Sequence, residues 1–290
     1  MVTGQRQAQP PETAADLLLP TRVARAMGDA RIGATVRYEA SVDSTNRLAR
    51  ELGRQGAMDG LVVIAEEQTA GRGRRRRSWV SPAGKGVYLS VLLRPVAPAA
   101  EAGPAAQLVA GIAVAESLAV HTGRSLMLRW PNDCYLGDRK MAGVLVESEV
   151  TGGTLDFLVC GIGINVNHEE GDFPADLMAR VTSLCLLSGH PQPRLPVVVS
   201  LLRALEYWDD VWRTHGLAPV IDRWLELSPE SRGSYVEIQT DKGLVRGVAS
   251  GLSPTGGLYV EDERQDRHEI IVGELVQLSP CTSEAQRRTP

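Results

Sequence analysis

The residues best suited to chemistry lie in one arginine-rich stretch, which runs from Glu66 to Trp79. Five of the six positions from 72 to 77 are arginines, and Gly73 is the single interruption. Glycine lets a backbone approach a ligand closely and adopt positive φ angles. The stretch therefore predicts a mobile loop that closes over a polyanionic ligand. The alternative is a solvated arginine run, or one that binds nucleic acid without specificity.

Two uncharged side chains in the same stretch favour a small ligand. Gln68 offers donors and an acceptor, and it follows directly after the apolar run 61–65, which predicts a buried strand. Trp79 supplies a flat apolar wall at the other end. A polyanion alone requires neither side chain, whereas a ligand with an amide-like head and a ring uses both.

Two further positions are candidates for binding. Lys140 starts an otherwise apolar strand, where a charge is costly unless it has an anionic partner; a surface lysine at a strand edge is the alternative. The run Asp43-Ser44-Thr45-Asn46 precedes a helical pattern and is typical of an N-cap. The free N–H groups of a helix start can also bind a ligand.

Two familiar nucleotide motifs are not matched. Gly84-Lys85 lacks the first glycine and the following Ser or Thr of a P-loop. Gly161-x-Gly163 lacks the third glycine of a dinucleotide fingerprint, and strand continues where a helix should begin. These glycines instead predict a flat strand surface for an apolar ring, or a bulge or tight packing.

The elements around these residues predict an α+β fold. Strands are expected at 36–39, 61–65, 87–93, 126–130, 139–147 and 155–166, and helices at 17–27, after 46, and at 104–122, 198–212 and 220–227. The strand–turn–strand order predicts a mixed, mainly antiparallel sheet with helices packed on one side. Four short strands, at 235–239, 244–250, 258–261 and 269–272, predict a small separate β-barrel.

These patterns divide the chain into four parts. Residues 1–34 are expected to be a partly disordered lead, too short for a helix-turn-helix domain, so no sequence-specific DNA binding is predicted. Residues 35–230 form the candidate catalytic domain, residues 231–279 the small β-barrel, and residues 280–290 a polar tail.

Composition limits the class of protein. The chain has 290 residues, 43% of them hydrophobic and 23% charged, which is ordinary for a soluble globular protein. A net charge of −4 argues against a protein whose main role is to bind nucleic acid. The four cysteines are widely spaced, which predicts reduced thiols, no structural metal site and a cytoplasmic location. No signal peptide is visible, and the most apolar helix, 104–120, is too short to span a membrane.

The combined motifs resemble those of biotin protein ligases, of the class that lacks an N-terminal DNA-binding domain. The matching stretches are Ser44-Thr45-Asn46, Glu66-x-Gln68-x-Ala70-Gly71-Arg72-Gly73-Arg74, Trp79, Tyr88-Leu89-Ser90, Trp130-Pro131-Asn132-Asp133, Lys140-x-x-Gly143-x-Leu145-x-Glu147 and Gly161-x-Gly163-x-Asn165. The resemblance implies a class II synthetase-like catalytic domain followed by an SH3-like β-barrel. Arg76 stands where this family usually has a glycine. Either the arginine is strained at a positive φ, or the loop takes a different path with Arg76 at negative φ, which we favour.

The resemblance also implies roles for individual residues. Biotin would bind to Ser44, Thr45, Asn46, Gln68, Gly71, Arg72, Gly73, Arg74, Lys140, Gly161 and Gly163. ATP would bind to Arg74, Trp79, Asn132, Lys140 and Asn165. Arg72, Arg74 and Lys140 would act in catalysis by neutralising the biotin carboxylate and the α-phosphate. Mg²⁺ would arrive on the ATP phosphates, with Asp133 as a candidate ligand and no separate metal site.

The implied reaction has two steps. The biotin carboxylate attacks the α-phosphate of ATP to give biotinyl-5'-AMP, so cations must offset the repulsion between two anions. A lysine of a biotin carboxyl carrier protein domain then takes the biotinyl group and AMP leaves. Asp133 is a candidate to assist this lysine, and a structural turn role for it is equally open. A lipoate or octanoate ligase or transferase of related fold and an arginine-loop RNA-binding module are the alternatives. Both a monomer and a homodimer remain open.

Overall fold

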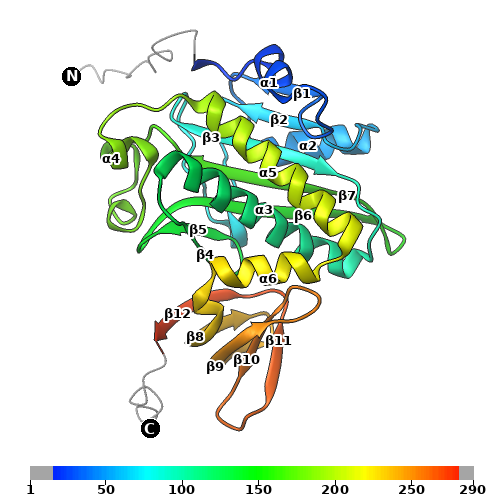
Figure 1. The fold of residues 1–290 in the computed structure, drawn as a ribbon, viewed down its shortest axis with the longest axis vertical. Helices are drawn as coiled ribbons and strands as arrows, with labels where there is room; N and C mark the ends of the chain where they lie inside the picture. The colour runs from blue at the N-terminus through cyan, green and yellow to red at the C-terminus, as the bar shows by residue number, and fades with distance from the viewer. Residues whose placement is uncertain (1–15, 281–290) are drawn as a thin grey trace, which may run out of the picture.

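The structure, a computed structural model, describes residues 16–280 and contains two β-sheets (Figure 1). The larger sheet has seven strands in the order β1-β2-β3-β7-β6-β5-β4. The smaller sheet has five strands in the order β11-β10-β9-β8-β12. The expectations of disorder before residue 16 and of a polar tail after residue 280 concern residues outside the described part of the chain.

The larger sheet is mixed and mainly antiparallel, as predicted. Its strands are β1 (Val36–Glu39), β2 (Val62–Ala65), β3 (Gly86–Leu93), β4 (Met127–Arg129), β5 (Asp133–Leu136), β6 (Arg139–Thr151) and β7 (Thr154–Asn165). β1 pairs with β2 in parallel, and every other neighbouring pair in this sheet is antiparallel. β5 was not predicted, because Asn132-Asp133 reads as a turn although Asp133 already pairs with Gly143 of β6.

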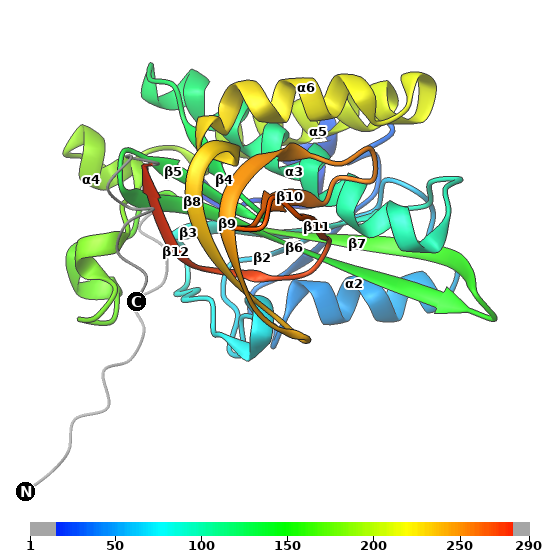
Figure 2. The same ribbon diagram turned by 90° about the horizontal axis from the view of Figure 1, so that it is seen from below.

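Helices cover both faces of this sheet, so the expectation of helices on one side is wrong (Figure 2). The helices are α1 (Pro20–Met27), α2 (Thr45–Arg54), α3 (Ala99–Thr122), α4 (Leu184–Ser188), α5 (Arg194–His215) and α6 (Ala218–Leu227). α3, α5 and α6 lie on one face, and α2 lies on the other. Ala49 of α2 belongs to a small apolar cluster with Val63 and Phe157. Successive residues of a strand point to opposite faces, so Val62 and Ile64 belong to the main core instead.

α3 is the central helix of the main core. By length and composition it could cross a membrane, but 67% of its most apolar window is buried inside the molecule. The helix begins at Ala99 and has 24 residues, so the expectation that it is too short to span a membrane is wrong. Its burial identifies it as a core helix. A Cβ atom at Gly111 would lie 2.5 Å from Trp224, so this glycine lets α6 pack closely on α3.

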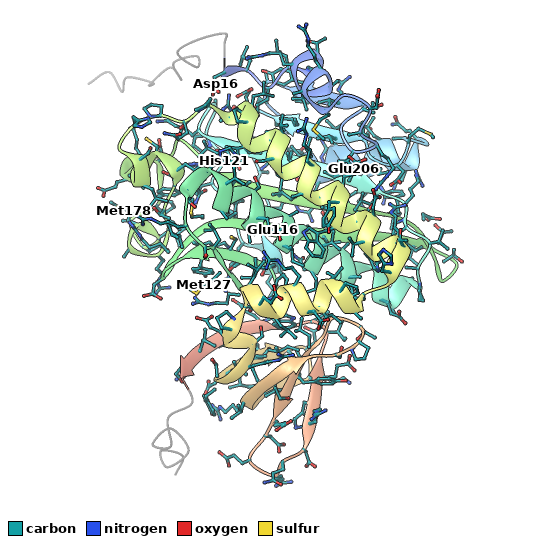
Figure 3. The ribbon with its side chains drawn as sticks, in the orientation of Figure 1. Asp16, Glu116, His121, Met127, Met178 and Glu206 are labelled. Atoms are coloured by element: carbon teal, nitrogen blue, oxygen red, sulfur yellow. The ribbon has the colours of Figure 1, made fainter. Side chains whose placement is uncertain are left out.

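The segment before β1 is part of the core from residue 16 onward. Leu18, Val23 and Ile32 are fully buried in the main cluster. Asp16 lies beside the first turn of α5, where its carboxylate is 2.7 Å from Arg194 Nε (Figure 3). Residues 16–34 are therefore part of the folded core, and the expected boundary of the catalytic domain at residue 35 is too late.

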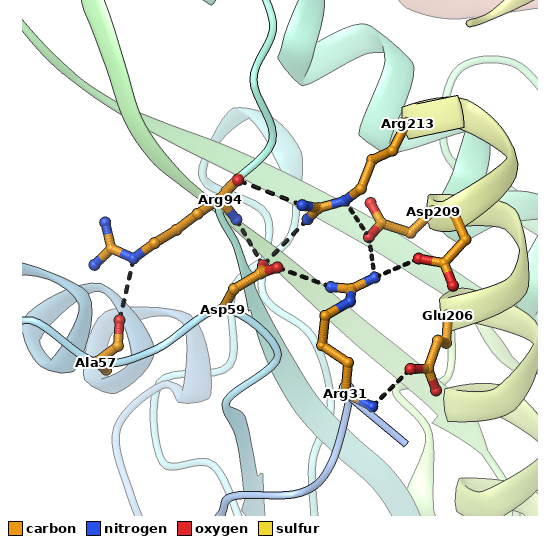
Figure 4. A network of polar contacts seen from close by, with 8 residues as sticks. Arg31, Ala57, Asp59, Arg94, Glu206, Asp209 and Arg213 are labelled. Carbon is orange, nitrogen blue, oxygen red and sulfur yellow. Dashed lines mark hydrogen bonds and ion pairs between the residues drawn. The ribbon is translucent and has the colours of Figure 1, made fainter. Parts of the chain in front are cut away.

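A network of charged side chains fastens the same segment to α5 (Figure 4). Arg31 forms ion pairs with Asp59 at 3.0 Å and with Asp209, which is fully buried. Arg213 of α5 pairs with the same two carboxylates. The backbone N–H of Arg31 also donates to Glu206. Shared carboxylates between two arginines compensate the buried charge of Asp209.

The smaller sheet forms a C-terminal β-unit, residues Arg232–Pro280, below the larger sheet in Figure 1. Its strands are β8 (Arg232–Thr240), β9 (Gly243–Leu252), β10 (Leu258–Glu261), β11 (Arg267–Ile270) and β12 (Glu274–Pro280), all paired antiparallel. The sequence predicted four of them and missed β12, whose alternation is interrupted by a register shift between Leu275 and Gln277. Arg129 of β4 donates two hydrogen bonds of 2.9 and 3.1 Å to Glu230, which lies just before β8. This contact holds the start of the unit against the larger sheet.

Candidate active site

A pocket of about 930 Å³ lies between the larger sheet and the C-terminal β-unit. Its walls come from the start of α2, the arginine loop, the segment 129–135, the central strands β6 and β7, the segment 173–181 and β12. Every site residue predicted from the sequence lines this pocket except Gly71. Residues that are far apart in the chain are therefore brought together at one site.

Uncharged side chains form a chain of hydrogen bonds in one corner of the pocket. The backbone N–H and the hydroxyl of Thr45 both donate to Gln68 Oε1, at 2.9 and 3.1 Å. Gln68 Nε2 donates to Ser81 Oγ at 3.0 Å. Ser90 Oγ lies 2.8 Å from Thr45 Oγ1 and 2.7 Å from Asn46 Oδ1. This corner offers neutral donors and acceptors, which suits an uncharged polar head group.

The start of α2 is capped in an unexpected way. Ser44 occupies the N-cap position but makes no capping hydrogen bond with its side chain. Gln68 accepts from the N–H of Thr45 instead. The segment therefore does provide the N-cap residue of α2, as predicted, but the Ser44 side chain does not make the predicted capping hydrogen bond. Ser81 and Ser90 orient Gln68 and Thr45. Ser81 was missed because no motif marks it, and Ser90 belongs to the matching stretch Tyr88-Leu89-Ser90 but had no role assigned to it.

Glycines of β6 and β7 make room for two side chains of the site. A Cβ atom at Gly163 would lie 2.4 Å from the Trp79 indole, and one at Gly143 would lie 3.1 Å from it. A Cβ atom at Gly161 would lie 2.0 Å from Asn46 Oδ1. The strand surface formed by Gly161 and Gly163, which was predicted either to carry a ligand ring or to allow tight packing, contacts Asn46 and Trp79. Tight packing therefore explains these glycines. The indole N–H of Trp79 is buried and has no hydrogen-bond partner within the described residues.

Replacing Gly163 by alanine is expected to lower the free energy of unfolding by about 1–3 kcal/mol, the usual cost of overpacking. The backbone of Gly163 is fixed between Tyr88 of β3 and Gly143 of β6, so the indole must move. Urea unfolding measures the change. Gly171→Ala is the matched control, since its Cβ would meet nothing within 4 Å. Equal losses in both variants would contradict the contact with Trp79.

The arginine loop is a short hairpin whose base lies at Gly71. Trp79 N donates to Gly71 O at 2.9 Å, and Gly73 N donates to Arg77 O at 2.7 Å. A Cβ atom at Gly71 would lie 2.4 Å from Trp79 O, so this glycine closes the base of the hairpin behind the pocket wall. Arg75 takes the left-handed conformation of the turn, with φ 49° and ψ 42°. Arg76 ends the same turn, and the positive φ falls on Arg75 rather than on Arg76, as the predicted different path requires. The side chain of Arg76 lies outside the described part of the structure.

Positive charge gathers on one side of the pocket. Lys140 Nζ lies 2.6 Å from Asp133 Oδ1 and 5.3 Å from the centre of the Trp79 ring. Arg72 pairs with Glu147 at 3.2 Å. The Arg74 guanidinium makes no hydrogen bond or ion pair within the described residues, although its backbone oxygen accepts from Arg77 N at 3.1 Å. Burial lowers the pKa of the Arg74 guanidinium, Asp133 opposes this, and Arg75 and Arg77 lower it further. An anionic ligand would compensate the buried charge of Arg74 and offset its repulsion from Arg75 and Arg77.

Two asparagines hold the backbone around the pocket. Asn132 Nδ2 donates to Val144 O at 3.1 Å, and Asn165 Nδ2 donates to Thr182 O at 3.0 Å. Neither amide oxygen makes a hydrogen bond within residues 16–280, so both remain available as acceptors. Arg180 also lines the pocket. No sequence pattern predicts this position, because its segment lacks apolar periodicity.

A buried histidine supports the pocket from behind. His168 is fully buried, its Nε2 lies 3.0 Å from Tyr88 Oη, and its ring stacks on Phe173 at 5.1 Å. Phe173 lines the pocket. Burial lowers the pKa of His168 to about 4.

Protonation of the unfolded chain then predicts a loss of stability in mild acid. Between pH 6.5 and 4 the unfolded histidine binds a proton that the folded one excludes, so stability falls as pH falls, by up to about 3 kcal/mol. His168→Gln should flatten this part of the profile, as measured by urea unfolding at pH 7.5 and 4.5. His215→Gln, at an exposed position, serves as the control. An unchanged slope in His168→Gln would contradict the assignment.

Comparison with known proteins agrees with this arrangement. Residues 38–165 match the model of the biotin/lipoate A/B protein ligase family. The chain is 34% identical over 224 residues to the bifunctional ligase/repressor BirA of Bacillus subtilis, which covers 77% of this chain and 68% of that protein. It is 32% identical over 260 residues to a biotin–[acetyl-CoA-carboxylase] ligase of Mycobacterium tuberculosis, covering 85% and 92% of the two chains.

A solved structure has the same fold. The biotin protein ligase from Aquifex aeolicus in complex with biotin and ATP superposes with a TM-score of 0.69 at 29% identity. The match covers 85% of this chain and 99% of that chain.

Proposed function

The chain belongs to the biotin/lipoate A/B protein ligase family, and we propose that it is a biotin–protein ligase. It activates biotin with ATP to biotinyl-5'-AMP and then transfers the biotinyl group to a lysine of a protein. The relatives named as biotin ligases, and the related structure that holds biotin and ATP, favour biotin over lipoate as the acyl substrate. The observation that carries the proposal is one pocket with a neutral polar corner and two cations, Arg74 and Lys140.

The polar corner is the proposed site of the ureido head of biotin. A ureido group has two N–H donors and one carbonyl acceptor, and the linked amide and hydroxyl groups of Gln68, Thr45 and Ser44 can match both kinds. From there the valeryl chain would run beside Gly73 towards Arg74 and Lys140. A hydroxyl or amide left unpaired in this corner would be costly, so a head group without N–H donors should bind poorly.

The cations are the proposed means of bringing two anions together. The biotin carboxylate must approach an α-phosphate that is also negative, and charge shifts as the new bond forms. Lys140 and Arg74 can stabilise that charge because they are already in place and need no reorganisation. The contact between Asp133 and Lys140 favours a positioning role for Asp133 over proton abstraction.

Mg²⁺ is proposed to enter with ATP. Within the described residues there is no group of three or more His, Cys, Asp or Glu side chains that could hold a metal ion. Mg²⁺ on nucleotide phosphates usually needs only one or two carboxylates, and Asp133 lines the pocket, so the residues fit such an ion. When bound, the ion would neutralise part of the phosphate charge.

The second step is proposed to use a biotin carboxyl carrier protein domain as acceptor. Biotinyl-5'-AMP is a mixed anhydride that water would hydrolyse, so the site must exclude water until the acceptor lysine arrives. Trp79 and the arginine loop line the pocket, and we propose that they provide this cover.

The proposal is tested by incubating the protein with ATP, Mg²⁺ and a carrier domain, with either labelled biotin or labelled lipoate. Transfer of the biotin label, dependent on ATP and lost when the acceptor lysine is replaced by arginine, is the expected result. Transfer of lipoate at an equal or higher rate would overturn the proposed substrate.

A further inference from the structure

The arginine loop is attached to the C-terminal β-unit by two of its arginines. Arg75 donates to the backbone oxygen of Gln239 at 2.7 Å and pairs with Glu274 Oε2 at 3.4 Å. Arg77 pairs with the other oxygen of the same carboxylate. A single glutamate therefore bridges two guanidinium groups of the arginine loop, although Arg75 and Glu274 are 199 residues apart in the sequence.

The anchor on the C-terminal side belongs to a hydrogen-bonded strand pair. Glu274 begins β12 and lies directly opposite Gln239 of β8, so both attachment points belong to one strand pair. Ile238, next to Gln239, is fully buried in the core cluster that the unit shares with the main sheet. β12 also forms one wall of the pocket. A loop fastened to this strand pair is therefore fastened to the pocket.

The loop needs such an attachment in order to stay in place. Its arginines carry like charges at neighbouring positions, and these repel one another. Arg75 in addition holds a left-handed backbone conformation, which is costly for a residue with a side chain. The carboxylate of Glu274 offsets both effects, because it attracts Arg75 and Arg77 together. Arg74, which directly precedes Arg75, makes no contact with Glu274 and remains in the pocket lining.

We propose that Glu274 is a positioning residue that latches the arginine loop onto β12 and so keeps Arg74 in the pocket. The loop thus uses Arg75 and Arg77 to hold its position, while Arg74 remains for the ligand. Retention of biotinyl-5'-AMP would depend on this latch, a consequence that rests on the proposed function. The latch itself is present without any ligand, so it can be tested separately.

Trypsin provides a direct test, because it cleaves after arginine and the loop offers consecutive sites. In the ligand-free full chain, Glu274→Gln is expected to speed cleavage within residues 72–77 at least fivefold, measured by mass spectrometry of the two fragments. Glu237→Gln is the matched control, because this glutamate of β8 pairs with Arg246 at 3.0 Å inside the same unit. Glu274→Asp keeps the charge and should stay within twofold of wild type, since Arg77 is 70% exposed and can follow.

The outcomes separate the latch from general loosening of the unit. Faster cleavage in Glu274→Gln alone, with an unchanged unfolding midpoint, supports the latch. Equal rates in all variants, or faster cleavage in both Glu→Gln variants, would overturn it. On enzyme loaded with biotin and ATP, the adenylate half-life without acceptor should shorten at least threefold in Glu274→Gln. If wild type forms no adenylate, the proposed function fails while the proteolysis result still decides the latch.

Discussion

Replacing Lys140 by alanine is expected to slow biotinyl-5'-AMP formation about 10²–10³-fold, because the loss of one preorganised group that stabilises developing charge costs about 2.7–4 kcal/mol. Lys140 lines the pocket, and it is held in place by Asp133 and the Trp79 ring. The fold should survive, because the side chains of Lys140 and Asp133 are each 24% exposed and water can reach the carboxylate that remains.

Pyrophosphate release from biotin and ATP measures this effect. Arg139→Ala is the matched control, because Arg139 is the preceding cation of the same strand and is exposed. Lys140→Arg tests charge against shape: it keeps the charge but places it on a planar group of different reach, so partial activity is expected. A rate for Lys140→Ala within tenfold of wild type would refute the assigned role.

The elements that local patterns predicted correctly are those whose own residues determine their structure. The apolar run 61–65 forms β2, and the run 87–93 forms β3. The packing of α2 on the opposite face was missed, since its apolar stripe does not indicate which side of a distant strand it will meet. β5 was missed because a turn-forming Asn-Asp pair leads into it. In both cases the structure depends on strands that are distant in the sequence: the strands on which α2 packs, and β6, with which β5 pairs.

The candidate site divides in the same way. Motif residues such as Gln68, Lys140 and Gly163 were predicted, since their types and spacing are informative on their own. Glu274 was not, because it acts through side chains that are distant in the sequence, and Ser90 stood in a matching stretch without an assigned role for the same reason. Gly71 was expected to bind the ligand, whereas the structure places it outside the pocket lining, at the base of the hairpin. Sequence motifs therefore identified the pocket but not the residues that hold it in shape.

Glu66 is such a supporting residue, and its replacement by alanine is expected to cost about 3–5 kcal/mol of folding free energy, the usual effect of breaking a buried ion pair. Glu66 Oε2 lies 2.7 Å from an Arg194 nitrogen, and Arg194 is fully buried. Glu66 Oε1 accepts from the N–H of Leu18 at 3.2 Å. The alanine variant would leave Arg194 with Asp16 as its remaining carboxylate, and Leu18 without an acceptor.

Urea unfolding at pH 7.5 measures this loss, with Glu67→Ala as the control. Glu67 accepts from Ser41 at the surface, so its removal should cost less than about 1 kcal/mol. Glu66→Gln keeps an oxygen for Leu18 and removes only the charge, so it should fall between the two. A loss in Glu66→Ala no larger than in Glu67→Ala would show that Arg194 is stabilised by other groups.

The pair itself makes a sharper prediction. A buried ion pair can often be replaced by apolar residues at little cost, since most of the penalty in a single variant comes from the charge left behind. Glu66→Leu combined with Arg194→Met should therefore be more stable than the sum of the single losses, by about 1–3 kcal/mol of coupling energy. Asp16 would lose its partner in the double variant, but its side chain is 27% exposed and water can solvate it. Additive losses in the cycle would mean that Glu66 and Arg194 stabilise the protein independently, through Leu18 and Gly86 respectively, and that the ion pair between them contributes nothing.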